Sequence, residues 1–209
     1  MKKHRIVSKI IIVFAIFFLM GLDWDKIELE SRAFATVIAI DKGEDENITL
    51  SLSIADIKKF GSDEGGTEYA KNIDAISLSK AIEDINNQMP NEIYYGHAKA
   101  IIISHEILNN PNSLTEVLNT LESLSDLNAK TLVLTTEKGE NASEILEIKP
   151  KENSLLGLYI TQFYSSKEDF KKQVNLEMLI REWRLENKAS VPVAIKSSEE
   201  AMVINPVSS

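Results

Sequence analysis

The 209 residues include no cysteine, which excludes thiolate metal ligands and cysteine nucleophiles and leaves carboxylates and histidines as the first candidates for metal or acid–base chemistry. His4 lies at the N-terminal tip, and the spacing of His97 and His105 across a predicted strand end matches no metal-binding motif. Neither a phosphate-binding glycine loop nor a G-x-S-x-G nucleophile motif is present. We therefore predict no catalytic residue, no metal and no cofactor, and we predict that the protein is not an enzyme.

Four acidic residues, Asp41, Glu44, Asp45 and Glu46, fall within the short stretch 41–47 (DKGEDEN). A calcium loop of the EF-hand type needs oxygen ligands at alternating positions, a glycine at the sixth position and a glutamate at the twelfth. The stretch does not have this spacing. We interpret it as the solvated turn of a hairpin.

An aromatic residue and two acids, Trp24, Asp25 and Glu28, follow directly after an apolar N-terminal run. A flexible linker at this position is normally small and polar. The structural interpretation is that Trp24 packs against the domain and fixes its orientation to the membrane. The functional interpretation is that this cluster contacts a membrane partner.

The apolar run itself, Ile10 to Leu22, has no charged residue and is preceded by four basic residues. This arrangement is typical of a signal peptide or an N-terminal anchor, although a full membrane span needs about 20 residues. The stretch LMGL is similar to a lipobox in which Leu22 occupies the cysteine position, so lipidation there is chemically impossible. We predict that residues 1–22 remain as an uncleaved anchor with the basic tip in the cytoplasm, which places the rest outside.

The charge of the chain excludes one class of partner. There are 23 basic and 32 acidic residues, for a net charge of −9, and the 44% hydrophobic content is that of an ordinary globular domain. Four basic residues precede the apolar run, which leaves 19 basic against 32 acidic residues, or −13, in the rest. Because a phosphate backbone would repel such a body, we predict no nucleic-acid binding.

Hydrophobic periodicity predicts the elements that position these residues. An apolar stretch at 35–40 and strict alternation over 48–54 predict a hairpin around the acidic turn. The glycine-rich, charged stretch 61–72 predicts an exposed loop. Apolar residues at helical spacing over 78–89 predict a helix that Pro90 ends.

Two largely apolar runs, 98–103 and 131–135, predict central strands that are buried on both faces. Between them, Ser113 and Glu116 form a capping-box pair, which predicts the start of an amphipathic helix. A helix is predicted over 155–163. A second capping pair, Ser166 and Asp169, predicts the start of a longer helix that reaches Trp183. Short strands are predicted at 191–195 and 202–204.

This order of elements predicts an α+β (mixed α/β) fold with a mixed, largely antiparallel sheet covered by helices. We assign residues 1–22 to a signal-like segment or membrane anchor and residues 23–196 to a single domain. Residues 197–209 are assigned to the truncated start of a following region, because no closing helix follows the last strands.

Two motifs resemble the Ger(x)C family, the C subunits of bacterial spore germinant receptors. The first motif runs from a tryptophan after the lipobox to an apolar strand that ends in Ile-Asp. The second has an aromatic residue, a small residue, a histidine and a lysine before another apolar strand. The matching residues are Trp24, Asp25, Glu28, Leu29, Asp41 and Lys42 in the first motif and Tyr95, Gly96, His97 and Lys99 in the second.

The resemblance covers about residues 19–195 and implies a non-catalytic subunit of a nutrient germinant receptor. It implies a location on the outer face of the spore inner membrane or the cell membrane, with integral-membrane A and B subunits as partners. The small-molecule germinant is not indicated. The candidate residues for structural or partner contacts are then Trp24, Asp25, Glu28, Asp41, Gly96, His97 and Lys99.

Two alternatives belong to other classes of protein. A free-standing extracytoplasmic ligand-binding or sensor domain would need a deep pocket lined by aromatic residues such as Tyr94, Tyr95, Tyr159 and Phe163. A cell-wall hydrolase would need two carboxylates that converge in a cleft about 5–9 Å apart. The predicted positions of the acids on turns and polar helix faces argue against the hydrolase.

Overall fold

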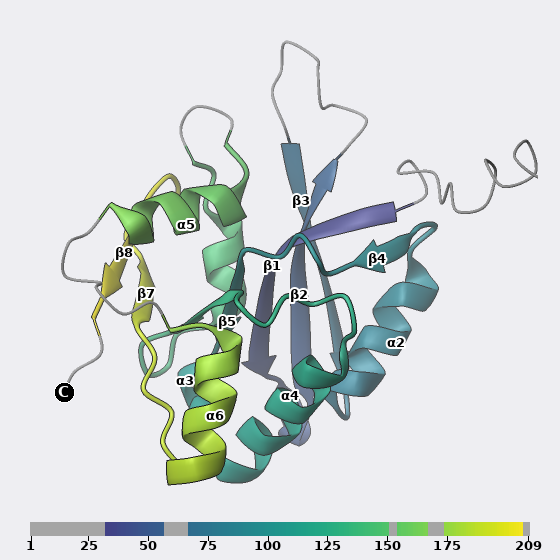
Figure 1. Cartoon of the computed structure of the whole chain (residues 1–209). Coiled ribbons are helices and arrows are strands. Elements are labelled where there is room, and N and C mark those ends of the chain that lie inside the picture. Colours follow the sequence, from purple (N-terminus) through teal and green to yellow (C-terminus); the bar gives the residue numbers. More distant parts are fainter. Residues whose placement is uncertain (1–31, 57–66, 151–153, 167–173, 207–209) are drawn as a thin grey trace, which may run out of the picture. The chain divides into compact units, whose positions relative to one another are not determined.

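The predicted hairpin forms the long central part of a mixed sheet in this computed structural model (Figure 1). Its strands are β1 (Arg32–Lys42) and β2 (Ile48–Asp56), which pair antiparallel with Ile40 opposite Leu50. The turn between them contains the short 3-10 helix η2 (Glu44–Glu46), in which Glu44 and Asp45 are exposed. The hairpin is therefore confirmed, and its turn is solvated at Glu44 and Asp45. The interpretation is wrong for Asp41, which lies within β1 and is buried. The structure describes residues 32–56, 67–150, 154–166 and 174–206.

The strands of the described residues follow the order β3-β2-β1-β5-β6-β7-β8, and β4 lies beside the start of β1. Pairing is parallel from β1 through β5 and β6 to β7, and antiparallel at both edges. Most paired residues are antiparallel because β1, β2 and β3 are long, which confirms the predicted α+β class. The other strands are β3 (Thr67–Ala75), β4 (Glu92–Tyr94), β5 (Ala100–Ile103), β6 (Leu132–Thr135), β7 (Val193–Lys196) and β8 (Met202–Asn205).

Helices cover both faces of the sheet, and each face has its own hydrophobic core. The first core joins α2, α3, α4 and α6 to β1, β2 and β5, and the second joins α5 and the 3-10 helix η4 to the other face. The bounds are α2 (Leu78–Gln88), α3 (His105–Leu108), α4 (Pro111–Ser123), η4 (Ala142–Glu147), α5 (Leu156–Ser165) and α6 (Leu176–Glu186).

A β-bulge at Thr36 decides which residues of β1 face each core. The register with β2 shifts between Ala35 and Val37. Ala35 lies in the first core, and beyond the bulge Ile38 lies there too, whereas Val37 lies in the second core. Side chains alternate between the two faces along a strand, and the extra residue at 36 shifts this alternation by one. The shift places the larger side chain of Ile38 in the first core and the smaller Val37 in the second.

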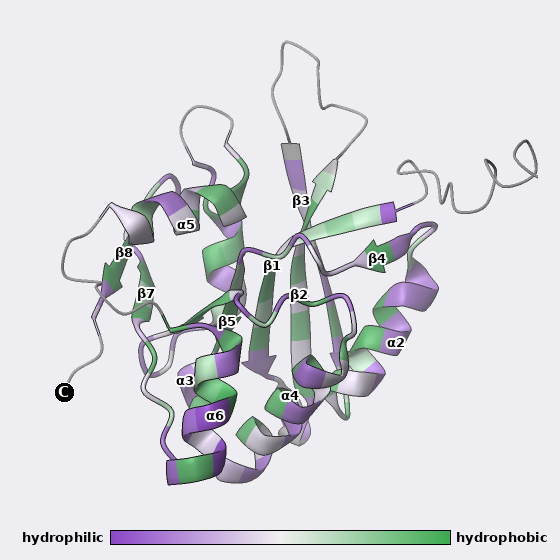
Figure 2. Cartoon of the chain, viewed as in Figure 1, coloured by the Kyte–Doolittle hydropathy of each residue, from purple (hydrophilic) through white to green (hydrophobic). Residues whose placement is uncertain are grey.

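The central strands are buried on both faces, as predicted. All four residues of β5 and all four of β6 are buried. Figure 2 shows hydrophobic residues along β5, whereas α2, α4 and α6 carry both hydrophobic and hydrophilic residues. This difference follows from burial, because a helix on a sheet keeps one side in water.

The predicted loop over 61–72 is wrong in its described part, since Thr67 to Ala75 form the nine-residue strand β3. The strand pairs with β2, with Ile73 opposite Leu50. Its composition is polar because β3 lies at the sheet edge, where Tyr69, Ala70, Asn72 and Asp74 are exposed. The short strand β4 was not predicted either, because three residues are too few to show a period.

The predicted capping box at Ser113 and Glu116 is wrong, although the helix it indicated exists. The N-cap of α4 lies three residues earlier, where the Asn110 side chain accepts hydrogen bonds from the amides of Asn112 and Ser113. Glu116 instead accepts a hydrogen bond from the amide of Leu78, at 3.0 Å, and so caps the neighbouring helix α2. Sequence spacing does not reveal this partner, which is 38 residues away.

The predicted start of the last helix at Ser166 is also wrong. Ser166 ends α5 as its C-cap residue, and α6 begins after Asn175, whose side chain accepts a hydrogen bond from the amide of Met178. Asp169 lies outside the described residues. The predicted helix over 78–89 is confirmed as α2, with Met89 as its C-cap.

None of the helices in the described residues has the length and apolar content that a membrane crossing requires. The predicted anchor, residues 1–22, lies outside the described residues. β8 pairs antiparallel with β7 as the last strand of the sheet. The proposed boundaries 1–22, 23–196 and 197–209 stay predictions.

Candidate functional site

Four of the predicted site residues, Asp41, Gly96, His97 and Lys99, lie in the described residues. The structure places the last three in the connection from β4 to β5, and Asp41 near the end of β1. Asp41 therefore lies apart from the other three along β1, since β4 pairs with the beginning of that strand. Leu22, Trp24, Asp25 and Glu28 lie outside the described residues.

His97 belongs to an aromatic cluster with Phe34 and Tyr94. The ring centroids of Phe34 and His97 lie 5.0 Å apart, and those of Phe34 and Tyr94 lie 5.8 Å apart, both edge to face. The guanidinium carbon of Arg32 lies 5.0 Å from the centre of the Tyr94 ring, in a cation–π contact. Parallel pairing of β1 with β4 places Phe34 beside Tyr94. Because His97 is exposed and the others are half-buried, the cluster presents an aromatic surface to solvent.

Gly96 makes this cluster possible. A Cβ atom at position 96 would overlap the hydroxyl and ring of Tyr94. The absence of a side chain therefore allows the Tyr94 ring to lie against the chain and contact His97, at 5.6 Å between ring centroids. The second motif therefore has a small residue at position 96 because a larger one would overlap Tyr94.

The backbone of Lys99 takes part in a set of contacts around Thr36, at the β-bulge, which we call the junction. Its amide donates a hydrogen bond of 2.8 Å to the carbonyl of Thr36, while its side chain is exposed. Gly157 of α5 packs against the same carbonyl, and a Cβ atom there would lie 2.6 Å from it. Glu68 of β3 accepts hydrogen bonds from the Thr36 hydroxyl and, at 2.7 Å, from the amide of Leu156. This junction ties α5 to the sheet.

Asp41 is a buried carboxylate that holds η4. Its two oxygens accept hydrogen bonds from the amides of Ala142, at 2.5 Å, and Ser143, at 2.9 Å. Burial raises the pKa of Asp41 above its ordinary value, and the two amide hydrogen bonds and a hydrogen bond with the Ser143 side chain oppose this effect. Both oxygens are occupied, so the role of this motif residue is to attach a segment about 100 residues away.

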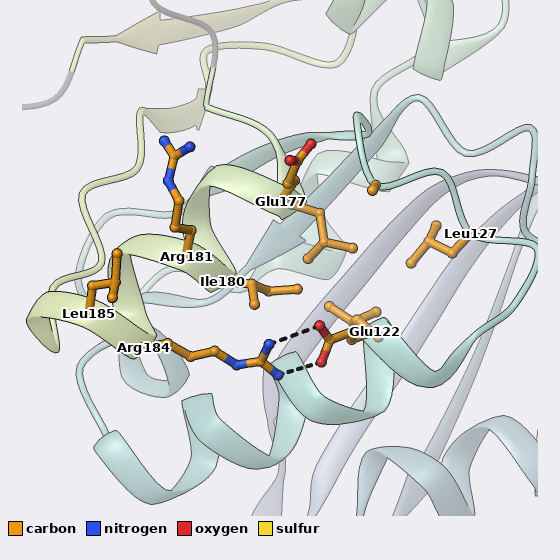
Figure 3. Close-up of a pocket in the computed structure, with 10 residues that line it drawn as sticks. Glu122, Leu127, Glu177, Ile180, Arg181, Arg184 and Leu185 are labelled. Atoms are coloured by element: carbon orange, nitrogen blue, oxygen red, sulfur yellow. Dashed lines mark hydrogen bonds and ion pairs between the residues drawn. The ribbon is translucent and has the colours of Figure 1, made fainter.

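A groove between α4 and α6 was not predicted from the sequence. It has a volume of about 420 Å³. Arg184 forms an ion pair with Glu122 across it, as Figure 3 shows. The one sequence feature that could have indicated this surface is Leu185, an apolar residue on the otherwise charged side of α6. Its side chain is 77% exposed in the structure. The apolar part of the lining consists of Leu121, Leu127, Ala129, Leu176, Ile180 and Leu185.

The aromatic residues named for a sensor pocket do not converge. Tyr95 belongs to the first core, whereas Tyr159 and Phe163 pack against the second core on the opposite face of the sheet. In the part of the chain that the structure describes, no group of three or more acidic or histidine side chains could hold a metal ion. The aromatic residues named for the sensor alternative therefore do not line one pocket.

The fold and these sites define a class of protein, an α+β domain whose motif residues build internal attachments and an aromatic surface patch. The sequence matches the family model described as "Spore germination protein N-terminal domain" over residues 25–196. The chain belongs to this family, which confirms the predicted resemblance to Ger(x)C proteins and supports a role in spore germination. Comparisons with curated proteins and with solved structures find no significant match.

Proposed function

We propose that the protein is a non-catalytic subunit of a nutrient germinant receptor. The observation that carries this proposal is the family match, which spans residues 25–196 and so includes the second motif and all of the first motif except Trp24. In this proposal the domain acts through contacts with the integral-membrane A- and B-type subunits. The half-exposed cluster of Phe34, Tyr94 and His97 supports it, because aromatic residues are enriched at protein interfaces.

The proposed attachment to the membrane is through residues 1–22. Leu22 stands where a lipoprotein of this type would have its cysteine, so the anchor is proposed to be the uncleaved apolar run. The positive residues before the run favour a cytoplasmic N-terminus and a domain on the outer face. The acidic body supports attachment through the apolar segment, since an anionic lipid surface would repel it.

The test uses sporulating cells that express the chain with a C-terminal tag, together with its A- and B-type subunits. The membrane fraction is solubilised mildly, the tagged chain is captured, and its intact mass and its co-purifying proteins are determined. We expect the full-length mass and both subunits. A cleaved, soluble product without these subunits would contradict the proposal.

A matched variant tests the anchor separately. Leu22→Cys restores the residue that lipoprotein processing requires. We expect this variant to show the mass of a cleaved, acylated chain, whereas the wild-type chain keeps the uncleaved mass. If the wild-type chain is itself cleaved near residue 22, the anchor proposal is wrong whatever its partners are.

A further inference from the structure

The strand β3 forms one outer edge of the sheet. It pairs with β2 along its whole length, from Thr67 opposite Asp56 to Ala75 opposite Ile48, and the register does not shift between these pairs. In the part of the chain that the structure describes, no strand pairs with its other side. A continuous edge strand presents a row of outward backbone amides and carbonyls, which are the groups that another β-strand binds.

This edge has few of the features that prevent strand addition in other proteins. Such edges are normally protected by a proline, a bulge, several charged side chains or a very short strand. β3 is nine residues long, has no proline and has one lysine, Lys71. The strand at the opposite edge, β8, has four residues and is followed by Pro206, which has no amide hydrogen. Of the two edges, β3 is therefore the one suited to pair with another strand.

The two acidic side chains of β3 are bound within their own sheet. Glu68 accepts a hydrogen bond from the Thr36 hydroxyl of β1. Asp74 accepts a hydrogen bond of 2.5 Å from the Thr49 hydroxyl of β2. Both partners lie on the inner side of β3, so these contacts hold the two carboxylates away from the open edge. Repulsion between two copies of this acidic chain is therefore reduced at β3.

A second copy of β3 is complementary to this edge in one antiparallel register. A two-fold axis normal to the sheet would relate the two strands and place residues of the same face opposite each other. An axis at Lys71 would place this residue opposite itself and Glu68 opposite Asp74, which are pairs of like charge. An axis at Asn72 instead pairs residues 69–75 with one another, and no like charges lie directly opposite. Charge therefore favours the register centred on Asn72.

The same register covers the exposed aromatic side chain of the strand. Tyr69 is 45% exposed and would lie diagonally across from Ile73 of the second copy. Diagonal neighbours are about 7–8 Å apart, which is within the reach of an aromatic ring. Because Ile73 packs against the first core, the contact would extend that core across the edge. At the axis, the exposed amide side chains of the two Asn72 residues can hydrogen-bond to each other.

We propose that the protein forms a two-fold symmetric dimer in which β3 pairs antiparallel with β3 of a second copy, centred on Asn72. The outward amides and carbonyls of each strand then bind those of the other, and one sheet continues through both copies. Pairing with β2 already holds β3 extended, so little conformational entropy is lost when the second strand binds. This inference goes beyond the proposed function, since the partner is neither of the membrane subunits.

Disulfide crosslinking tests the register, because the chain has no cysteine of its own. Asn72→Cys would place two thiols opposite each other, with Cα atoms about 4.5–5.5 Å apart, which a disulfide can bridge. Lys71→Cys is the matched control on the same strand, since its two copies would be diagonal and about 7–8 Å apart. The full chain is purified in mild detergent, oxidised gently and separated by non-reducing electrophoresis. We expect Asn72→Cys to become mostly a linked dimer and Lys71→Cys to stay mostly unlinked.

Sedimentation of the full chain in the same detergent measures the dimer without a crosslink. Asn72→Asp would place two carboxylates opposite each other, so we expect its dimer dissociation constant to rise about tenfold. Asn112→Asp, the same change at an exposed residue of α4, should leave the dissociation constant unchanged. A monomeric wild-type chain, equal crosslinking of the two cysteine variants, or equal dissociation constants for the two aspartate variants would each overturn the proposal. The capture of A- and B-type subunits is a separate measurement, so the proposed function stands or fails independently.

Discussion

At the scale of single residues, acidic side chains act as internal acceptors in this strongly acidic protein. Asp41, Glu68 and Glu116 each accept backbone hydrogen bonds at the start of a helix that is distant in the sequence. Asp126 similarly accepts a hydrogen bond of 2.6 Å from the amide of Tyr95. A carboxylate is suited to this role because the first amides of a helix lack partners within the helix.

The Asp41 contact gives a prediction that depends on pH. Asp41→Asn replaces one oxygen with an NH2 group that cannot accept a hydrogen bond, whereas both oxygens of Asp41 can accept even when the acid is protonated. We therefore expect a loss of about 1–3 kcal/mol in the free energy of unfolding. Because burial raises the pKa of Asp41 above its ordinary value of 3.8, the native state holds the proton more tightly than the unfolded state. The contribution of Asp41 is therefore greatest below about pH 4 and declines as the pH rises through the raised pKa.

Denaturant unfolding of wild type and Asp41→Asn between pH 4 and 7 checks this dependence. The difference in unfolding free energy should be largest at acid pH and shrink as the pH rises, since asparagine does not titrate. Asp45→Asn, an exposed acid in the hairpin turn, is the control and should change the free energy by less than about 0.5 kcal/mol. If the difference in unfolding free energy between wild type and Asp41→Asn instead grows with pH, the pKa of Asp41 is lowered in the folded state and the prediction is wrong.

Gly96 gives a second prediction at this scale. Gly96→Ala places a methyl group on the Tyr94 ring, so we expect a loss of about 1–3 kcal/mol from overpacking. In a Tyr94→Ala background the same substitution should cost much less, because the overlapping ring is absent. Thermal unfolding of the four chains measures this coupling. An equal cost in both backgrounds would show that Gly96 is required for a reason other than Tyr94.

At the scale of elements, each helix begins where an acceptor is available, and that acceptor is often outside the helix. α4 and α6 are capped by their own asparagines, Asn110 and Asn175. α2 receives a cap from its own Ser77 and a second acceptor, Glu116, from α4. The packing of α4 beside α2 therefore helps to fix the first residue of α2, because it supplies an acceptor for the amide of Leu78.

Substitutions at the start of α4 can distinguish the capping predicted from the sequence from the capping seen in the structure. Asn110→Ala removes the acceptor for two amides and should lower the free energy of unfolding by about 1 kcal/mol. Ser113→Ala, which would disrupt the predicted capping box, should cost less than about 0.5 kcal/mol, since the Ser113 side chain makes no hydrogen bond with the described residues. Chemical denaturation measures both. The reverse order of costs would restore the capping-box prediction.

At the scale of the whole molecule, one sheet with helices on both faces separates two different surfaces. The face with α4 and α6 carries the groove, whereas α5 packs on the other face and is fixed through Thr36, Glu68 and Gly157. The sheet is extended at one edge by β8. Residues 202 and 204 of this strand are buried in the second core, so the strand contributes to packing.

The β8 strand tests whether residues 197–209 begin a separate region. Met202 is 2% exposed, and Met202→Ala should lower the free energy of unfolding by about 2–5 kcal/mol because it leaves a cavity. The neighbouring Val203 is 43% exposed, and Val203→Ala should cost less than about 0.5 kcal/mol. Denaturant unfolding of the full chain compares them. A small cost for Met202→Ala would support the boundary at residue 196.

The sequence by itself determined the elements with a clear hydrophobic period and the family of the protein. The hairpin of β1 and β2, the buried strands β5 and β6 and the helices α2, α4 and α5 follow from spacing that is local in the chain. The resemblance was recognised from the types and order of motif residues that include Asp41, Gly96, His97 and Lys99. The family match confirms the family, whereas the roles of these residues stay predictions.

Only the tertiary structure decided what those residues contact. The aromatic cluster requires β4 beside β1, the attachment of η4 requires Asp41 about 100 residues earlier, and the groove requires α4 and α6 on the same face. The strand β3 was missed because its polar residues suit an edge, where backbone pairing with β2 outweighs composition. These features depend on partners that are distant in the sequence, and hydrophobic periodicity carries no information about such partners.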